Sequence, residues 1–251
     1  MLTKKLEKGL KDLRLPTIRQ SYQKLSAKAQ GERAPYEEYL YWLIDEETEN
    51  RKERRIQRRL IESKIPLTKE LENFDLKRLP PNLARQIKSL LGADIIDNRE
   101  NLLIFGSPGS GKTHLACGLG QHQIKEHDHR VHYTSSTRLV QDLLLAKQTY
   151  QLPKHIKRLI SYDALIIDDI GYVQQSKEEM EVLFTLIADC YERTSIILTS
   201  NLPFSKWESI FKDPMVTAAA IDRLIHHSVI LEMNVKSYRL EASKRAKELK
   251  R

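Results

Sequence analysis

The stretch that decides the fold is Gly106-Ser107-Pro108-Gly109-Ser110-Gly111-Lys112-Thr113. It fits the pattern G-x-x-x-x-G-K-[ST] and lies between an apolar run over 101–105 and a helix predicted over 114–125. Glycines let backbone N–H groups converge on phosphate oxygens, and the helix presents its positive N-terminus to them. The sequence therefore predicts a strand, a phosphate-binding loop and a helix in succession.

Two residues at the end of this loop have predicted roles of their own. We expect Lys112 to reach the β- and γ-phosphates of a nucleotide and to act in catalysis, and Thr113 to offer its hydroxyl to Mg²⁺. The rest of the loop is expected to hold the phosphates: Gly106, Ser107, Pro108, Gly109, Ser110 and Gly111.

A second apolar run ends in two carboxylates, Leu165-Ile166-Ile167-Asp168-Asp169. Charged groups at the end of a buried strand are costly unless a cation awaits them, and Mg²⁺ with its waters is such a cation. We expect Asp168 to hold the Mg²⁺ hydration shell and Asp169 to polarise the attacking water as general base. Glu is commoner than Asp at this position in AAA+ ATPases, so the shorter side chain predicts slow or partner-dependent hydrolysis.

A third strand, over 195–199, delivers Ser200 and Asn201 to the same edge of the sheet. We favour Asn201 over Thr199 as the residue that orients the lytic water and senses the γ-phosphate. The alternative is a turn-forming Asn before Leu202-Pro203.

Two arginines near the end of the chain are further candidates. Arg223, in Asp222-Arg223-Leu224, lies at the end of a predicted helix and could reach the γ-phosphate on a neighbouring subunit, which requires an oligomer. A structural salt bridge with Asp222 is the competing interpretation. Arg239, in Ser237-Tyr238-Arg239, is a second candidate for nucleotide or interface contact.

The motifs narrow the class of nucleotide-binding protein. Asp168 and Gly171 also satisfy the Asp-x-x-Gly signal of GTPases, but no Asn-Lys-x-Asp follows. There is no Leu-Ser-Gly-Gly-Gln signature of ABC-type ATPases. The AAA+ group of ATPases, with ATP and Mg²⁺ as cofactors, is the best remaining fit.

Apolar runs alternate with helical stretches from residue 99 onward, which predicts an α/β fold with a parallel sheet flanked by helices. Ahead of it, residues 1–65 contain only two Gly and two Pro, and their apolar residues recur at helical spacing. We predict a small all-α domain of about three helices over 1–65, broken at Pro16 and over 29–32, with the longest starting near Pro35. A connector over 66–98 with a helix near 82–91, a core over 99–235 and a C-terminal helix or tail over 236–251 complete the chain.

The net charge of +8 is confined to the two ends. Residues 1–65 carry +5 and residues 236–251 another +5, which leaves −2 on the rest. This distribution favours a polyanion-binding appendage on a neutral core, although positive flanks can also serve solubility alone.

Two groups of basic residues could contact DNA phosphates. The first lies in the longest N-terminal helix and comprises Arg51, Lys52, Arg54, Arg55, Arg58 and Arg59. A solvated helix end is an equally good interpretation of this group. Tyr36, Tyr39, Tyr41 and Trp42 in the same helix are expected to form the core of the small domain rather than a base-stacking platform.

Other function classes are disfavoured. No apolar run approaches the roughly 20 residues that span a bilayer, and residues 1–8 do not resemble a secretory signal, so we expect a cytoplasmic, nucleoid-associated protein without membrane contact. Cys117 and Cys190 are expected to be reduced core thiols. The histidines predict no metal site, because the adjacent His226 and His227 cannot face one ion from a regular helix or strand.

With these motifs in order, the chain resembles the IstB/DnaC-like AAA+ ATPases, and specifically the IstB-type helper proteins of insertion sequences. The resemblance rests on the basic helical module, on 106–113, on 165–172, and on 197–201, 222–224 and 237–239 as an ordered set. It implies a homo-oligomeric ATPase that binds double-stranded DNA largely without sequence preference and works with a cognate transposase in target selection and insertion. The helical segment over 137–160 resembles the extra insertion of the initiator clade, where Lys147, Lys154, Lys157 and Arg158 could line a DNA channel or be ordinary surface charges.

Two other functions remain open. A replicative helicase loader has the same core, but its N-terminal module binds a helicase rather than DNA. A DNA-binding architectural protein with a degenerate pocket is disfavoured by the intact Lys112, Thr113 and Asp168.

Overall fold

The computed structural model describes residues 1–93, 95–171, 176–211 and 213–238. They belong to two compact units, Met1–Arg58 and Arg59–Arg251, each described by itself below. The division falls inside the helix α3 (Tyr36–Ser63), whereas the sequence places it after residue 65.

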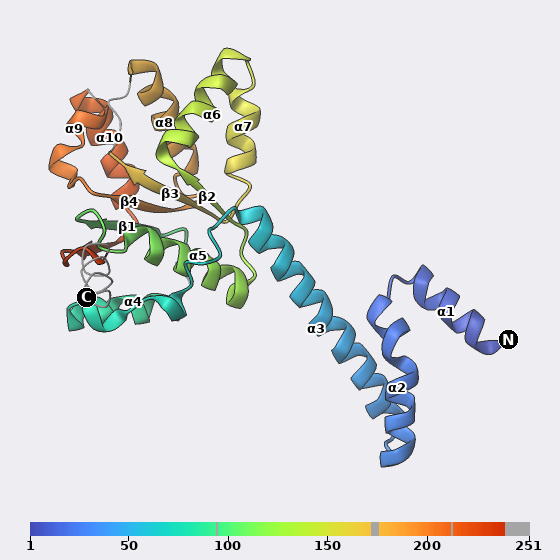
Figure 1. Cartoon of the computed structure of the whole chain (residues 1–251). Coiled ribbons are helices and arrows are strands. Elements are labelled where there is room, and N and C mark those ends of the chain that lie inside the picture. The colour runs from blue at the N-terminus through green and yellow to red at the C-terminus, as the bar shows by residue number, and fades with distance from the viewer. Residues whose placement is uncertain (94, 172–175, 212, 239–251) are drawn as a thin grey trace, which may run out of the picture. The chain divides into compact units, whose positions relative to one another are not determined.

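The second unit is built on a five-stranded sheet with the strand order β2-β3-β4-β1-β5 (Figure 1). Every pairing is parallel, which confirms the predicted architecture. The apolar runs over 101–105, 165–169 and 195–199 form β1 (Asn101–Gly106), β3 (Ala164–Ile170) and β4 (Ser195–Ser200), and two further strands are β2 (Val131–Ser135) and β5 (Ser228–Met233). Since parallel strands end at the same edge of the sheet, the phosphate loop after β1 and the carboxylates of β3 lie at that edge.

Helices cover both faces of this sheet (Figure 1). The face with α5 (Lys112–His127) also carries α4 (Pro81–Leu91), and the opposite face carries α6 (Ser136–Gln148), α8 (Lys177–Cys190) and α10 (Pro214–Ile225). The central strands β1 and β4 are buried along almost their whole length, as expected for strands covered on two sides. A large apolar cluster fills the face under α6, α8 and α10, with Trp207 fully buried in it.

Local capping fixes where several of these helices begin. Ser176 and Glu179 form a capping box at the start of α8, and the Asp213 carboxylate accepts hydrogen bonds from the backbone N–H groups of Met215 and Val216 at the start of α10. Ser135 caps α6 in the same way. The end of β2 therefore leads directly into α6, and α7 (Leu152–Leu159) follows after a short turn.

The segment predicted as a connector is a packed part of the second unit. It contains the short 3₁₀ turns η1 (Leu71–Asn73) and η2 (Leu76–Arg78) before α4, which confirms the expected helix near 82–91. The apolar residues of α4 and of the chain after it are buried, including Ile87 and Ile96. The segment is therefore held against the core rather than linking two bodies loosely.

The first unit consists of α1 (Leu2–Asp12), α2 (Pro16–Glu32) and the first part of α3, as predicted. Its apolar core is small, and a buried carboxylate contributes to it. Glu47 of α3 accepts hydrogen bonds from the backbone N–H groups of Thr17 and Ile18, at 2.8 and 3.0 Å, and pairs with Arg51 at 2.8 Å. Burial opposes ionisation of Glu47, but the hydrogen bonds from Arg51, Ile18 and Thr17 outweigh it and lower its pKa.

Two predictions for this unit are wrong. Residues 29–32 do not interrupt the helix. They form the last turn of α2, which ends where Arg33 adopts a left-handed conformation. Tyr36 and Tyr41 are exposed rather than part of the core, because no part of this unit covers either ring, whereas Tyr39 and Trp42 are half-buried.

Among the described residues, the structure has no helix that combines the length and the apolar character needed to cross a bilayer.

Candidate nucleotide-binding site

The loop between β1 and α5 depends on glycine at two positions. Gly109 and Gly111 have φ angles of +80° and +104°, which L side chains rarely adopt. A Cβ atom on Gly109 would come within 2.2 Å of Ser237 Oγ, and one on Gly111 would meet the Phe74 ring at 3.0 Å. The loop is therefore shaped both by its own conformation and by two segments that lie far away in the sequence.

Lys112 is the first residue of α5 and is buried. Its ammonium donates hydrogen bonds to the carbonyl oxygens of Gly106, at 2.9 Å, and of Ser107, at 3.1 Å. These contacts fold the side chain back over the loop, toward the space that the predicted phosphates would occupy. Thr113 lies next to it at the helix N-terminus, where the macrodipole favours negative charge.

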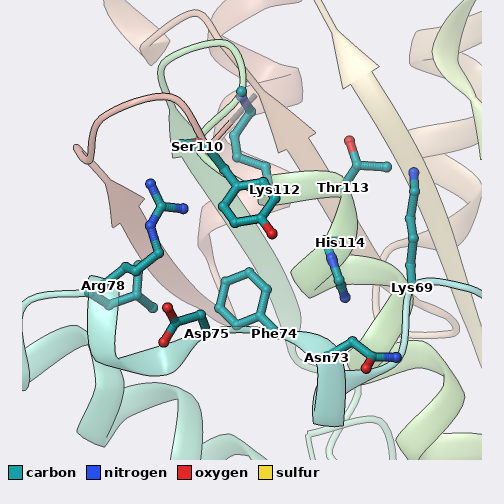
Figure 2. Close-up of a pocket in the computed structure, with 13 residues that line it drawn as sticks. Lys69, Asn73, Phe74, Asp75, Arg78, Ser110, Lys112, Thr113 and His114 are labelled. Carbon is teal, nitrogen blue, oxygen red and sulfur yellow. The ribbon is translucent and has the colours of Figure 1, made fainter. Parts of the chain in front are cut away.

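A cavity of about 240 Å³ opens beside this loop. Figure 2 shows Ser110, Lys112 and Thr113 on one side of it and Phe74, Asp75 and Arg78 of the segment before α4 on the other. The Phe74 ring meets the His114 ring edge-on, with 5.4 Å between centroids. The phosphate loop thus forms one wall of the cavity, and an aromatic ring with polar neighbours forms the other.

Arg78 and Tyr238 close one end of the same cavity. The guanidinium lies 4.9 Å from the centroid of the Tyr238 ring and donates a hydrogen bond to the carbonyl of Lys236 at 3.2 Å. The cavity could accept the nucleoside part of a nucleotide, since aromatic rings and polar side chains line it next to the phosphate loop. The sequence does not predict Phe74, Asp75 or Arg78, because no motif marks the segment over 66–98 as part of the site. Tyr238 stands beside the predicted Arg239 but is not itself predicted to line the site.

Asp168 lies at the end of β3 with both carboxylate oxygens engaged. The Thr199 hydroxyl donates to Oδ1 at 2.7 Å, and the Tyr133 hydroxyl donates to Oδ2 at 3.0 Å. Burial, and next the neighbouring Asp168 charge, raise the pKa of Tyr133, so its hydroxyl stays a donor. The neighbouring strands β2 and β4 thus hold this carboxylate in one orientation.

Asp169 has an unusual backbone for a strand residue. Its φ angle is +65°, and the pairing of β3 with β4 shifts register between Ile167 and Ile170. The Thr199 hydroxyl oxygen accepts a hydrogen bond from its N–H at 2.8 Å, and its carbonyl accepts one from the Ser136 hydroxyl at 2.8 Å. Left-handed residues other than Gly are uncommon, and they occur where surrounding contacts fix them, often at functional sites.

Thr199 therefore has a larger structural part in the site than the sequence predicts. It is fully buried and bonds to both adjacent aspartates. Asn201 lies just beyond β4 and lines a second cavity together with Gly106 and Ser107. Its Oδ1 atom is buried and has no hydrogen-bond partner among the described residues.

The candidate arginines lie apart from this cavity or outside the described chain. Arg223 is in the last turn of α10, where it donates to the Ala219 carbonyl at 2.8 Å and lies 5.3 Å from the centroid of the Phe184 ring. It is not among the described residues that line the cavity beside the phosphate loop. Arg239 and most of the predicted tail fall outside the described residues.

The donor set fits Mg²⁺. Hydroxyl and carboxylate oxygens are the ligands this ion prefers, and it usually keeps several waters. Thr113 at the start of α5 and Asp168 at the end of β3 offer one of each at the edge of the sheet. Burial raises the pKa of the Cys117 thiol to about 12; the Lys69 charge opposes this shift, and the Asp168 charge adds to it.

Several predicted DNA contacts have partners within the protein. Arg51 pairs with Glu47 and donates to the Arg14 carbonyl, Arg59 pairs with Asp128 at 2.7 Å, and Lys147 pairs with Glu181 at 2.9 Å. Lys154, Lys157 and Arg158 are exposed on α7. The remaining basic residues of the first group are exposed on α3, namely Lys52, Arg54, Arg55 and Arg58.

The argument against a shared ion for His226 and His227 is wrong in its geometry. The chain leaves α10 at His226, so the two rings are not constrained by a regular helix. Their ligand atoms and a carboxylate oxygen of Glu192 all lie within 4.8 Å of one another, and all three side chains are exposed.

Comparison with known proteins agrees with this geometry. The model of the family described as IstB-like ATP binding protein matches residues 8–246. An insertion sequence ATP-binding protein of Sinorhizobium fredii is 41% identical over 95% of this chain and 80% of its own length. The IS21 ATP-binding protein of Pseudomonas aeruginosa is 34% identical over 96% of this chain and 91% of its own length.

Solved structures support the fold alone. The DnaC helicase loader superposes with a TM-score of 0.57 at 20% identity and covers 68% of this chain and 98% of its own. The replication initiator DnaA, solved with AMPPCP and single-stranded DNA, gives a TM-score of 0.57 at 21% identity over 74% of this chain and 56% of its own. The expected fold of the core, a parallel sheet flanked by helices, is therefore confirmed.

Proposed function

Because the chain belongs to the family of IstB-like ATP binding proteins, we propose that it is a Mg²⁺-dependent ATPase that binds double-stranded DNA and helps a transposase to select target DNA and insert into it. The observation that carries the proposal is the convergence of catalytic groups at one sheet edge. The phosphate loop follows β1, and the Asp168–Asp169 pair, fixed by Thr199, lies at the end of β3. The names of the insertion-sequence relatives supply the biological setting.

Each residue of this edge has a distinct part in the proposed reaction. Lys112 exchanges the loop carbonyls for β- and γ-phosphate oxygens, and the cavity wall of Phe74 and Arg78 holds the nucleoside. Thr113 and Asp168 would hold Mg²⁺, which neutralises phosphate charge when it is bound. Tyr133 and Thr199 keep Asp168 in place by donating to it.

Asp169 is the proposed general base. Its backbone is tied to β4 through Thr199 and to α6 through Ser136, so its carboxylate leaves the strand in a fixed direction. Asn201, which follows β4 and lines the cavity beside Gly106 and Ser107, is the residue proposed to orient the attacking water. An Asp base that cannot reach as far as Glu makes turnover slow until DNA or a partner adjusts the site.

Assembly on DNA completes the proposal. Arg223 is half-buried in the last turn of α10, apart from the described lining of its own nucleotide cavity, and would serve the site of a neighbouring copy. ATP and duplex DNA together should therefore drive formation of a multimer. Binding to chromosomal DNA would place the protein in the cytoplasm, with the nucleoid.

A retention experiment with purified partners tests the function. The tagged protein, loaded with ATP and duplex DNA, is offered the cognate transposase or a replicative helicase in separate reactions. We expect retention of the transposase, and its loss in Lys112→Ala. Retention of the helicase alone would instead assign the chain to the helicase loaders, whose core it shares at the level of fold.

A further inference from the structure

Three metal-ligating side chains meet at the edge of the sheet opposite the nucleotide site. Glu192 lies in the turn between α8 and β4, His226 follows the last turn of α10, and His227 comes directly before β5. Because parallel strands all begin at one edge, the starts of β4 and β5 bring these residues together on the far side of the sheet from the phosphate loop. The mechanism proposed above uses none of the three.

The three side chains have the chemistry and the spacing of a metal site. Their ligand atoms all lie within 4.8 Å of one another, and the two imidazole rings are 4.1 Å apart between centroids. Two imidazoles and a carboxylate are a donor set that Zn²⁺ accepts, and three protein ligands leave its fourth position to water. All three side chains are exposed, so an ion can reach them from solvent and small side-chain rotations can bring them to one centre.

The backbone that carries these side chains is fixed on both sides of the site. The turn that contains Glu192 is closed by two hydrogen bonds of 2.9 Å to the Cys190 carbonyl, and Glu192 itself has a φ angle of +57°. The His227 carbonyl accepts a hydrogen bond from the backbone N–H of Asn101 at 2.6 Å, which joins it to β1. Ligands that already stand on fixed backbone lose little conformational entropy when an ion binds.

Tyr191 supports two of the three ligands from behind. Its hydroxyl forms a hydrogen bond of 2.9 Å with Nδ1 of His226, and the same hydroxyl interacts with the Glu192 carboxylate. A histidine that binds a metal through one ring nitrogen usually has its other nitrogen hydrogen-bonded, which fixes the tautomer and the orientation of the ring. With Nδ1 held by Tyr191, Nε2 is the nitrogen of His226 that is left to bind an ion.

We propose that Glu192, His226 and His227 bind a divalent transition metal ion of the Zn²⁺ class, with water as the fourth ligand. The ion fastens the end of α10 to the turn that follows α8. Arg223 lies one turn before His226 and 5.3 Å from the centroid of the Phe184 ring of α8, so the ion also stabilises the segment that carries this arginine. Only that last consequence rests on the proposed function; the metal site itself does not.

Titration of the full chain with Zn²⁺ tests the site. The protein is freed of metal with a chelator and titrated in a calorimeter without nucleotide. We expect the wild type to bind Zn²⁺, and His227→Gln and Glu192→Gln each to weaken this binding by roughly a hundredfold. Tyr191→Phe keeps all three ligands but removes the hydroxyl, and should weaken binding by about tenfold. His155→Gln, on α7 and outside the cluster, is the matched control and should bind as the wild type does.

Hydrogen exchange measures the structural consequence. Zn²⁺ should slow exchange at the end of α10 and in the turn over 191–194 of the wild type, and should have no such effect in His227→Gln. A wild type that binds no Zn²⁺, or equal affinity in the wild type and both ligand variants, would overturn the proposal. Lys112→Ala should bind Zn²⁺ as the wild type does, so a failure of the proposed ATPase function would leave this result intact.

Discussion

The Arg59–Arg251 unit and the Met1–Arg58 unit differ in what holds their helices in place. The first buries almost every apolar position of its central strands under helices on two faces. The second leaves Tyr36 at 90% exposure and Tyr41 at 62%, and a single buried carboxylate, Glu47, ties α2 to α3. Burial of apolar surface fixes the nucleotide site in the larger unit, whereas the smaller unit depends on a few polar contacts.

If each unit is stabilised by its own contacts, a substitution in one unit should not change the stability or the function of the other. The largest expected effect is in the nucleotide site. Lys112→Ala removes the ammonium that faces the phosphates, so we expect ATP binding to fall below detection in an equilibrium binding measurement. The helices of the smaller unit should keep their hydrogen-exchange protection.

Lys125→Ala is the matched control for this change. It lies on the same helix and pairs with Glu70 at 3.2 Å. It should bind ATP as the wild type does. Equal loss in both variants would show that charge on α5, and not the position of Lys112, governs binding.

The next largest effect separates chemistry from binding. Asp169→Asn keeps a side chain that tolerates the left-handed backbone and removes the base, so kcat should fall about 10³-fold while ATP affinity stays within twofold. Steady-state hydrolysis and equilibrium binding measure the two quantities. Unchanged hydrolysis would remove Asp169 from the general-base role.

A smaller effect is expected at Thr199. Thr199→Val keeps the shape of the buried side chain but removes the bonds to Asp168 and Asp169, so kcat should fall about tenfold and half-maximal activity should require more Mg²⁺. Thr199→Ser should restore the wild-type Mg²⁺ dependence. If Val and Ser behave alike, the hydroxyl does not position Asp168.

The smallest effect on catalysis is expected from the smaller unit. Glu47→Gln removes the charge that accepts hydrogen bonds from Thr17, Ile18 and Arg51, and should destabilise the packing of α2 on α3 by about 2 kcal/mol. ATP affinity should not change. Hydrogen exchange in α2 measures the first quantity, and faster exchange in α5 as well would break the independence of the units.

The same carboxylate gives the smaller unit a pH dependence. Because folding lowers the pKa of Glu47 below its ordinary value of 4.5, its contribution is complete above that pH. It is lost as the pH falls through the lower pKa of the folded state. Acid should therefore loosen α2 in the wild type more than in Glu47→Gln, as measured by hydrogen exchange.

The sequence predicts the sheet well because each strand is an apolar run bounded by helical stretches. It predicts the phosphate loop and the Asp168–Asp169 pair because their motifs stand beside such runs. It does not predict the Phe74 and Arg78 wall, since packing of 66–98 on the core depends on tertiary contacts. It does not predict that Thr199 holds both aspartates, because order along the chain does not show which side chain meets them. Helical spacing likewise places Tyr36 and Tyr41 on α3 without showing what covers them.

We infer that binding of ATP to the loop that contains Lys112 controls the affinity of the protein for DNA. The most direct test of this inference measures the affinity of the wild type and of Lys112→Ala for one duplex, with and without a non-hydrolysable ATP analogue, at a fixed salt concentration. We expect the analogue to tighten DNA binding by the wild type at least tenfold and to have no effect on Lys112→Ala. Equal DNA affinity with and without the analogue in the wild type would contradict it.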